Sequence, residues 1–179
     1  IKEANAGGTF GFALGQLGIA GMTLHGEASD WTVMHISIEG EVSFSPADNL
    51  MGLSNFECAA KLHEQFGKKV SLGICGPVGE YLGLLSGISF SDTDLRPSRL
   101  AARGGVGAVM GAKKVKAIVL DLNKMPKLHD RKKVIGAVKQ YNAFLKEDEI
   151  AQNMKTFGTA LMADTQNYLG GLPVRNFTA

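Results

Sequence analysis

The stretch that decides the fold is residues 99–120, RLAARGGVGAVMGAKKVKAIVL. Its first half places glycines at positions 104, 105, 107 and 111, and its second half ends in the β-branched run Val115 to Leu120. Such a run is typical of a buried strand. Glycine permits positive φ and leaves no bulk beside the backbone, so that N–H groups can converge on an anion. The pattern therefore indicates a glycine-rich turn followed by a strand.

Two interpretations of this turn stay open on the residues alone. In the first it holds an anion: Arg103 supplies a planar fork suited to phosphate or carboxylate, and a short helix opened by Ala108 would favour a phosphate at its start. In the second, the glycines serve only tight packing of a helix on a sheet. The spacing matches no Walker loop and matches the dinucleotide fingerprint poorly, with no acidic residue at the expected distance.

Length and composition limit the classes of function. The chain has 179 residues, of which 45% are hydrophobic, so we expect one domain or one and a part. The formal net charge is +2, which gives no support to nucleic-acid or membrane-surface binding. No apolar run approaches the ~20 residues of a transmembrane helix, and no signal peptide is visible. The ends read as cut, because Ile1 is not a methionine and the last motif runs straight into Thr178 and Ala179.

The remaining periodicity predicts an α+β fold: a mixed sheet with packed helices, followed by the start of an α-helical domain. We expect strands at 22–25, 31–38, 41–44, 69–75 and 115–120. We expect helices after Thr9 as N-cap, from the capping box Ser54–Glu57 to Gly67, and over 81–85 after the turn 76–80. Residues 89–98 read as a polar loop. Beyond about residue 124 the period becomes helical, over 134–145 and 150–163 with a break near 156–159, so we divide the chain into domains 1–123 and 124–179.

Few side chains suggest catalysis. No nucleophile–base pair and no paired carboxylates are evident, so no catalytic residue is assigned. Cys58 and Cys75 lack the spacing of a cluster or zinc site and are expected to be buried free thiols of a reducing compartment. His25 and His35 are expected at the surface or satisfied within strands, and Glu80 reads as an acid favoured by a helix dipole.

Three glycine-rich turns, at 5–8, 76–79 and 104–107, lie at the boundaries of predicted elements. Together they would make a platform for a large, phosphate-bearing ligand, with Asn5 and Arg103 as its polar groups. The alternative is a non-catalytic module in which the turns hold a nucleotide or another anion, or only pack.

Four stretches, in the same order, resemble the aldehyde ferredoxin oxidoreductase family. They are ANAGG at 4–8 with Phe10–Gly11, GPVGE at 76–80, ARGGVGAVMGAK at 102–113 and GGLPVRNF at 170–177. The resemblance implies a fragment that covers most of an N-terminal cofactor-binding domain, incomplete at its start, and the truncated beginning of a helical domain. The loop 89–98 departs from the shorter, glycine-rich link that is usual in the family.

The resemblance also implies a function. The cofactor would be tungsten or molybdenum on a bis-pterin, with Mg²⁺ bridging its phosphates. It would be bound by Asn5, Ala6, Gly7 and Gly8, and by Ala102, Arg103, Gly104, Gly105, Val106 and Gly107. A [4Fe–4S] cluster would be held by residues outside this chain, and no metal ligand is assigned within it.

The implied reaction oxidises a small aldehyde to a carboxylic acid and passes electrons through the cluster to ferredoxin or a partner subunit. The enzyme would be cytoplasmic and could form a homo-oligomer, and this chain by itself is expected to be inactive. A family member that reduces an aromatic thioester would keep the cofactor and change the substrate.

Overall fold

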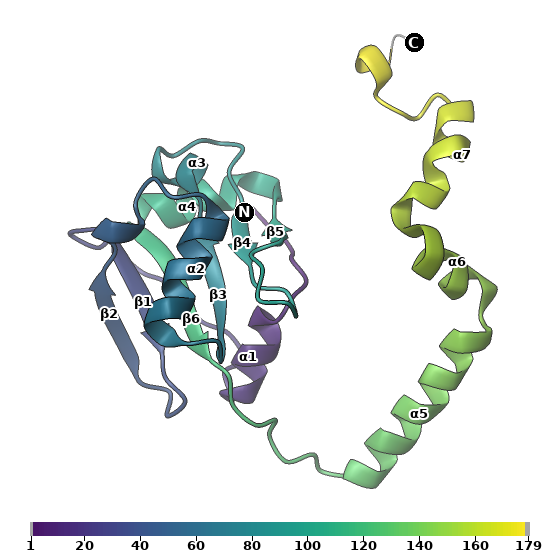
Figure 1. Ribbon diagram of the computed structural model, residues 1–179, viewed down its shortest axis with the longest axis horizontal. Coiled ribbons are helices and arrows are strands. Elements are labelled where there is room, and N and C mark those ends of the chain that lie inside the picture. The colour runs from purple at the N-terminus through teal and green to yellow at the C-terminus, as the bar shows by residue number, and fades with distance from the viewer. Residues whose placement is uncertain (1, 178–179) are drawn as a thin grey trace. The chain divides into compact units, whose positions relative to one another are not determined.

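The computed structural model describes residues 2–177. Ile1, Thr178 and Ala179, on which the expectation of cut ends rests, lie outside the described residues. The chain divides into two compact units, Ile1–Pro126 and Lys127–Ala179 (Figure 1). The predicted domain boundary between residues 123 and 124 stays a prediction.

The first unit is built on a six-stranded sheet of order β2-β1-β6-β3-β4-β5. Strands β1 and β6 are parallel and the other neighbours are antiparallel, which confirms the predicted mixed sheet and α+β class. The strands are β1 Thr32–Ile36, β2 Val42–Pro46, β3 Val70–Cys75, β4 Ile88–Phe90, β5 Arg99–Ala101 and β6 Val115–Asp121. The central strands β3 and β6 are buried on both faces except at Asp121, as expected of their apolar runs.

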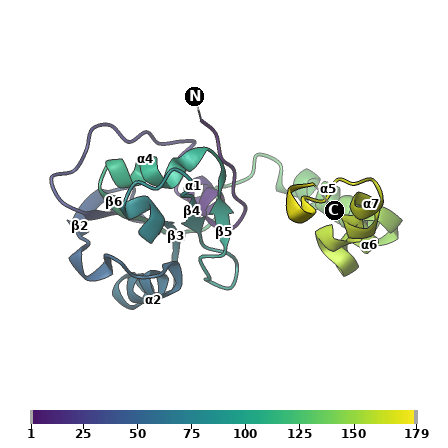
Figure 2. The same ribbon diagram turned by 90° about the horizontal axis from the view of Figure 1, so that it is seen from above.

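Helices cover both faces of the sheet, as the view from above shows (Figure 2). They are α1 Phe10–Gln16, α2 Asn55–Phe66, α3 Pro77–Glu80 and α4 Val106–Ala112, with short 3₁₀ helices η1 Asp48–Leu50 and η2 Arg103–Gly105. One core cluster joins Leu62 of α2 to Leu72 and Val119, and the other joins Ala13 of α1 and Met110 of α4 to Ile118. The glycine-rich turn thus lies on the face opposite α2.

The predicted limits of α2 are confirmed. The Ser54 hydroxyl accepts the N–H of Glu57, and the Glu57 carboxylate accepts the N–H of Ser54, which is the capping box read from the sequence. The helix ends at Phe66, followed by Gly67 with φ 81°.

Other local predictions were wrong. Residues 22–25 form no strand, because they pair with none of the six strands of the sheet, although Met22 and Leu24 still pack on the core. The helix expected over 81–85 lies at 77–80, since Pro77 favours the first helical position. Strand β4 overlaps the start of the expected loop 89–98, and β5 directly follows its end. Each strand has three residues, too few to show a periodicity.

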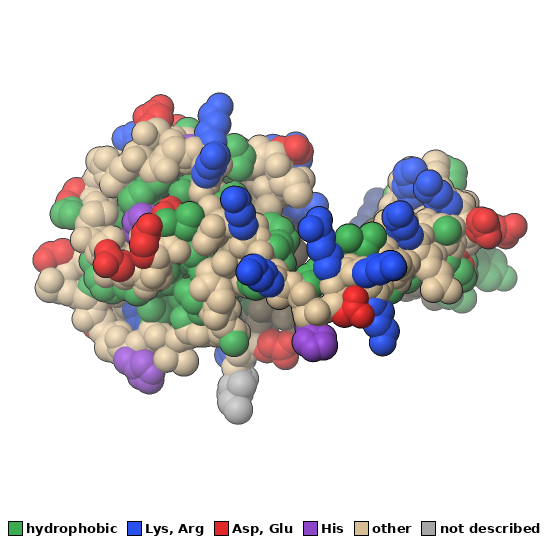
Figure 3. Space-filling model, turned by 90° about the horizontal axis from the view of Figure 1, so that it is seen from below, with side chains coloured by type: hydrophobic (Ala, Val, Ile, Leu, Met, Phe, Trp, Pro, Cys, Tyr) green, Lys and Arg blue, Asp and Glu red, His purple; other side chains and the backbone are tan. Residues whose placement is uncertain are grey.

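The second unit is helical, with α5 Arg131–Glu147, α6 Glu149–Phe157, η3 Gly158–Met162, α7 Ala163–Tyr168 and η4 Val174–Asn176. Asp130 and Asp148 cap α5 and α6, and the predicted break is confirmed at Gly158, where φ is 58°. Lys and Arg side chains gather around the linker and the start of α5 (Figure 3). None of the helices in the described part of the chain is both long and apolar enough to cross a membrane.

Candidate functional site

The N-terminal segment and the glycine-rich turn, far apart in sequence, meet on one side of the first unit. A cavity of about 320 Å³ is lined by Asn5, Ala6 and Gly7 from the segment and by Val106 from the start of α4. The aromatic rings of Phe10 and Phe90, whose centroids lie 4.9 Å apart, line the same cavity. The tertiary structure therefore brings together two stretches that the sequence singled out separately.

A second hollow, of about 720 Å³, adjoins the turn itself. Residues 102–105 line it, together with Lys2 and the three leucines of the loop after α3, Leu82, Leu84 and Leu85. These leucines are at least half exposed, so this wall of the hollow is apolar and open to solvent. A ligand that spanned both hollows would meet an apolar surface at one end and the N-terminal segment at the other.

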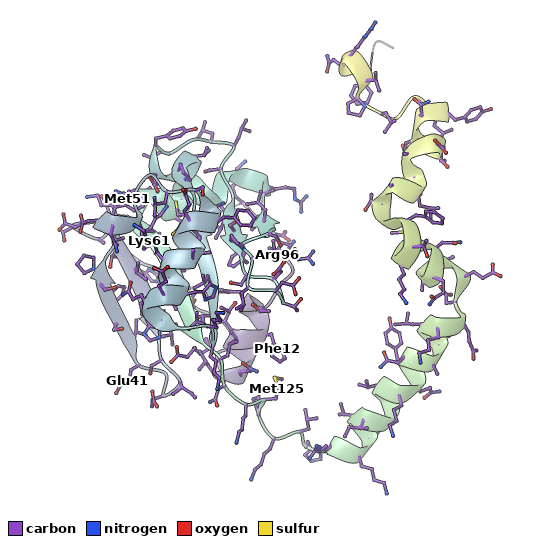
Figure 4. The ribbon with its side chains drawn as sticks, viewed as in Figure 1. Phe12, Glu41, Met51, Lys61, Arg96 and Met125 are labelled. Carbon is purple, nitrogen blue, oxygen red and sulfur yellow. The ribbon has the colours of Figure 1, made fainter. Side chains whose placement is uncertain are left out.

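Two cations, Lys2 and Arg103, line the second hollow, and a third, Arg99, lies beside the N-terminal segment. Arg103 lies in the turn, Lys2 packs against Gly104, and the Arg99 side chain packs against Gly8. Within residues 2–177 none of the three forms an ion pair or a side-chain hydrogen bond. Arg96, by contrast, is paired with Asp92 and Asp94 in the loop between β4 and β5 (Figure 4). The site thus carries three cations that form no ion pair with an acidic side chain of the described chain, while the Glu3 carboxylate of the same segment accepts a hydrogen bond from the Asn5 amide.

Backbone donors add to this positive charge. In the described part of the chain, the N–H groups of residues 4–8 have no hydrogen-bond acceptor, and the first paired one is Thr9, which donates to the Ser91 carbonyl at 2.9 Å. Thr9 stands at the N-cap position of α1, but its hydroxyl bonds Ser71 and Ser91 instead of capping the helix, which corrects the expected role. Unpaired N–H groups beside cations suit an anionic ligand such as a phosphate.

The predicted site glycines divide between the two interpretations. Gly104 is exposed and has φ 75°, and a β-carbon there would lie 3.2 Å from Cβ of Lys2, which packs on it. Gly7 lines the first hollow, and nothing lies within 4 Å of a β-carbon added there. A β-carbon on Gly105 would lie 2.6 Å from the Leu84 carbonyl oxygen, and one on Gly107 would lie 2.5 Å from that of Gly87. One on Gly8 would collide with the Ser91 carbonyl. Close packing thus explains Gly8, Gly105 and Gly107, the positive φ explains Gly104, and Gly7 is open to a ligand.

The third glycine turn, at 76–79, lines neither hollow. A β-carbon on Gly79 would lie 2.9 Å from the Gly107 carbonyl oxygen, and the Cys75 sulfur lies 3.5 Å from that same oxygen. This turn therefore supports the platform from behind instead of forming part of its surface.

The sequence analysis missed a buried ion pair behind the turn. Lys116 in β6 is completely buried, and its Nζ donates to the Cys75 carbonyl oxygen at 2.8 Å and to Oε1 of Glu80. The sequence singles out Glu80 as a carboxylate in a suggestive position and favours an acid at a helix start, without predicting its pairing with Lys116. The sequence does hold a signal for this ion pair, which is a lysine inside a continuous apolar run. A strand buried on both faces gives a charged side chain no route to water, so that side chain needs a buried partner.

The two cysteines and the two histidines for which the sequence predicts a place all lie in the first unit. Cys58 and Cys75 are buried free thiols, as predicted, and burial raises both pKa values, that of Cys75 to about 11. His35 is satisfied by Asp121 at 2.9 Å and His25 is exposed, which confirms their expected places. Among residues 2–177 no three His, Cys, Asp or Glu side chains are grouped to hold a metal ion.

Comparison with known proteins identifies the family. The model of the aldehyde ferredoxin oxidoreductase N-terminal domain matches residues 1–122. The chain belongs to the aldehyde ferredoxin oxidoreductase family. Tungsten-containing aldehyde ferredoxin oxidoreductases are 32% identical to it in Pyrococcus furiosus and 33% identical in Pyrococcus abyssi, over 99% of this chain in both.

These alignments cover nearly all of this chain but only part of each relative. The alignments cover 29% of the Pyrococcus furiosus oxidoreductase and 28% of the Pyrococcus abyssi protein, so the chain spans less than a third of its relatives' length. Among solved structures, the active site complex BamBC of benzoyl coenzyme A reductase, with bound 1,5-dienoyl-CoA, superposes with a TM-score of 0.72. That match has 23% identity and covers 82% of this chain and 21% of the other, which shows a shared fold.

Proposed function

We propose that this chain forms the pterin-binding platform of a tungsten- or molybdenum-dependent oxidoreductase that converts small aldehydes to carboxylic acids. The observation that carries the proposal is the meeting of the N-terminal segment with the Arg103 turn, flanked by the unpaired cations Lys2 and Arg99. This arrangement suits a large ligand with phosphate groups, and the family's tungsten-containing members match the chain over nearly its whole length.

The residues present fit such a cofactor in named roles. Arg103 would hold a phosphate through its guanidinium fork, and Lys2 and Arg99 would add positive charge around it. The N–H groups of Ala6 and Gly7 would donate to phosphate oxygens. The Asn5 amide, whose nitrogen donates to Glu3, has an oxygen that could ligate a bridging Mg²⁺.

The bound cofactor would supply the two-electron chemistry at its metal, and the protein's part is to bind, orient and shield it. Gly7, with nothing within 4 Å of an added β-carbon, would let the ligand approach the backbone closely. The leucines at 82, 84 and 85 would exclude water from one side of the ligand. Aldehyde binding, proton transfer at the substrate and the ligands of a [4Fe–4S] cluster are assigned to other parts of the enzyme.

The partners follow from this role. Electrons would pass through the cluster to ferredoxin or an electron-transfer subunit, and the enzyme could be a homo-oligomer. We place the protein in the cytoplasm, because two buried thiols without a disulfide suit a reducing compartment. The chain by itself is expected to bind the cofactor without turning over aldehydes.

The deciding experiment is elemental analysis for tungsten, molybdenum and iron, with pterin fluorescence after oxidation. The chain would be purified without oxygen from a host that makes the bis-pterin cofactor. Stoichiometric tungsten or molybdenum with pterin, and without iron, would support the proposal. A chain free of both metals and of pterin, but able to bind nucleotides, would favour the alternative of a non-catalytic anion-binding module.

A further inference from the structure

Lys116 occupies an irregular position in the sheet. Thr32 of β1 pairs with Val115 of β6, but the next residue, Val33, pairs with Ala117. Lys116 is therefore the extra residue of a β-bulge, a feature that redirects a side chain out of the regular alternation. Its side chain is completely buried, the largest of the fully buried side chains in the described chain.

The redirected ammonium group joins elements that are distant in sequence. It donates to the Cys75 carbonyl at the end of β3 and to Oε1 of Glu80 at the end of α3. The other carboxylate oxygen of Glu80 accepts the Gly52 N–H, just before α2, at 2.9 Å. The pair thereby ties the short helix α3 to β6, β3 and the segment that leads into α2.

The other side of α3 supports the glycine-rich turn. A β-carbon on Gly111 of α4 would collide with the Gly79 carbonyl, and one on Gly79 would lie 2.9 Å from the Gly107 carbonyl oxygen. The Gly107 N–H donates to the Ser86 carbonyl at 3.2 Å, in the loop after α3. Backbone lies against backbone here, with no flexible side chain between them to absorb a shift. A displacement of α3 therefore reaches the turn directly.

We propose that the Lys116–Glu80 pair is a positioning device, which sets the place of α3 and through it the place of the Arg103 turn. This inference rests on the proposed function, in which that turn holds the phosphates of the cofactor. Neither side chain touches the ligand hollows, so both act through α3 and α4.

A charged pair suits this task better than apolar packing. Replacing a buried ion pair by neutral groups of similar volume is often neutral for stability, so stability alone does not explain the pair. Charge-assisted hydrogen bonds are short and directional, and three of them converge on this carboxylate and ammonium. They constrain the position of α3 in a way that apolar contacts of the same area would not.

The test uses the variant Lys116→Met/Glu80→Gln, which removes both charges and nearly conserves volume. Thermal unfolding measures global stability, and native-state hydrogen exchange followed by mass spectrometry measures local opening of residues 102–108. We expect an unfolding midpoint near that of the wild type and exchange of the 102–108 amides about tenfold faster, with exchange in β1 unchanged. Chains loaded in the cofactor-producing host should also lose tungsten or molybdenum faster on dialysis.

The matched control is Asp121→Asn, which perturbs the pair with His35 at the opposite end of β6 and should leave exchange at 102–108 unchanged. If the double variant does not fold, Glu80→Asp keeps the charge, shortens the side chain and is measured in the same way. The proposal is overturned if a folded variant of the pair leaves exchange at 102–108 as in the wild type, or raises it equally throughout the sheet. Because exchange is measured on the metal-free chain, it decides this inference even if the wild type binds no metal.

Discussion

The backbones of Gly79 and Gly111 lie in direct contact, so that a methyl group on Gly111 would overlap the carbonyl oxygen of Gly79. This contact joins α3 to the last turn of α4, and the neighbouring contact of Gly79 with the Gly107 carbonyl places the start of α4, where the glycine-rich turn ends, against the same short helix. Neither glycine has a positive φ, so the requirement is for space and not for an unusual backbone conformation.

Gly111→Ala should therefore destabilise the first unit. Overpacking costs about 1–3 kcal/mol, which the better helix propensity of alanine offsets in part. Chemical denaturation followed by circular dichroism would measure the loss. Gly15→Ala in α1 is the matched control, because nothing lies within 4 Å of its added β-carbon, and it should be neutral or stabilising. Equal stability of the two variants would contradict the contact.

Arg103→Ala should weaken retention of the cofactor while leaving the fold intact, because Arg103 is exposed and has no partner among the described side chains. Losing a charge-assisted hydrogen bond costs about 1.5–3 kcal/mol, or roughly tenfold to a hundredfold in affinity. Arg103→Lys should recover part of the effect, since it keeps the charge without the fork. Metal content after dialysis is the measurement, with Lys68→Ala on an exposed turn elsewhere as control. Full metal occupancy in Arg103→Ala would remove this residue from the site.

Asp92 should make the stability of the first unit depend on pH below about 4, near the unfolded pKa of an aspartate. Burial acts to raise the pKa of Asp92, but hydrogen bonds from Ser98, Arg96 and Asp94 outweigh it and lower the pKa well below its ordinary value. As the pH falls, the unfolded state takes up a proton before the folded state does, so the stabilisation is present above the unfolded pKa and is lost on acidification.

The variant Asp92→Asn tests this dependence. Urea unfolding from neutral pH down to the acid limit of solubility should show a shallower fall in stability than in the wild type. The variant should also be less stable at neutral pH, because the loop 92–98 loses its charged acceptor. Parallel curves for the two proteins would show that Asp92 contributes nothing to the pH dependence.

The two cysteines should react slowly in the folded protein. Burial raises the pKa of Cys75 to about 11 and raises that of Cys58, so that few thiolates form at neutral pH and access is blocked. The rate of reaction with a chromogenic disulfide reagent should depend on unfolding. It should be slow in buffer and fast in denaturant. Rapid labelling of either cysteine in buffer would show that its site opens.

Ser54→Ala should cost about 0.5–2 kcal/mol, the usual loss at an N-cap. The Ser54 hydroxyl accepts the Glu57 N–H, and the carboxylate of Glu57 accepts the N–H of Ser54, so removal of the hydroxyl breaks half of a reciprocal pair. Denaturant unfolding measures the change, and Ser54→Asp should restore most of the stability. A loss below experimental error in Ser54→Ala would show that the cap is dispensable.

Local patterns were sufficient for much of the fold. The strands predicted at 69–75 and 115–120, the capping box at Ser54 and the breaks at Gly67 and Gly158 each depend on neighbours within a few residues. The structure confirms them, with the strands at 70–75 and 115–121. The α+β class follows from the periodicity of the predicted strands and helices. The family follows from the four glycine-rich motifs, which are contiguous strings that need no folding to be recognised.

Tertiary structure decided what those motifs do. In the folded chain Asn5 and Val106 line one cavity. Gly107 and Gly79 pack against each other, and Lys116 pairs with Glu80. The three-residue strands β4 and β5 exist because they pair with β3 and with each other, not because of their own residues. Strand pairing depends on residues tens of positions apart. So does the space around a glycine, which decides whether a β-carbon there would clash with another segment of the chain. No local periodicity records such distances, so the site's geometry emerged only from the folded chain.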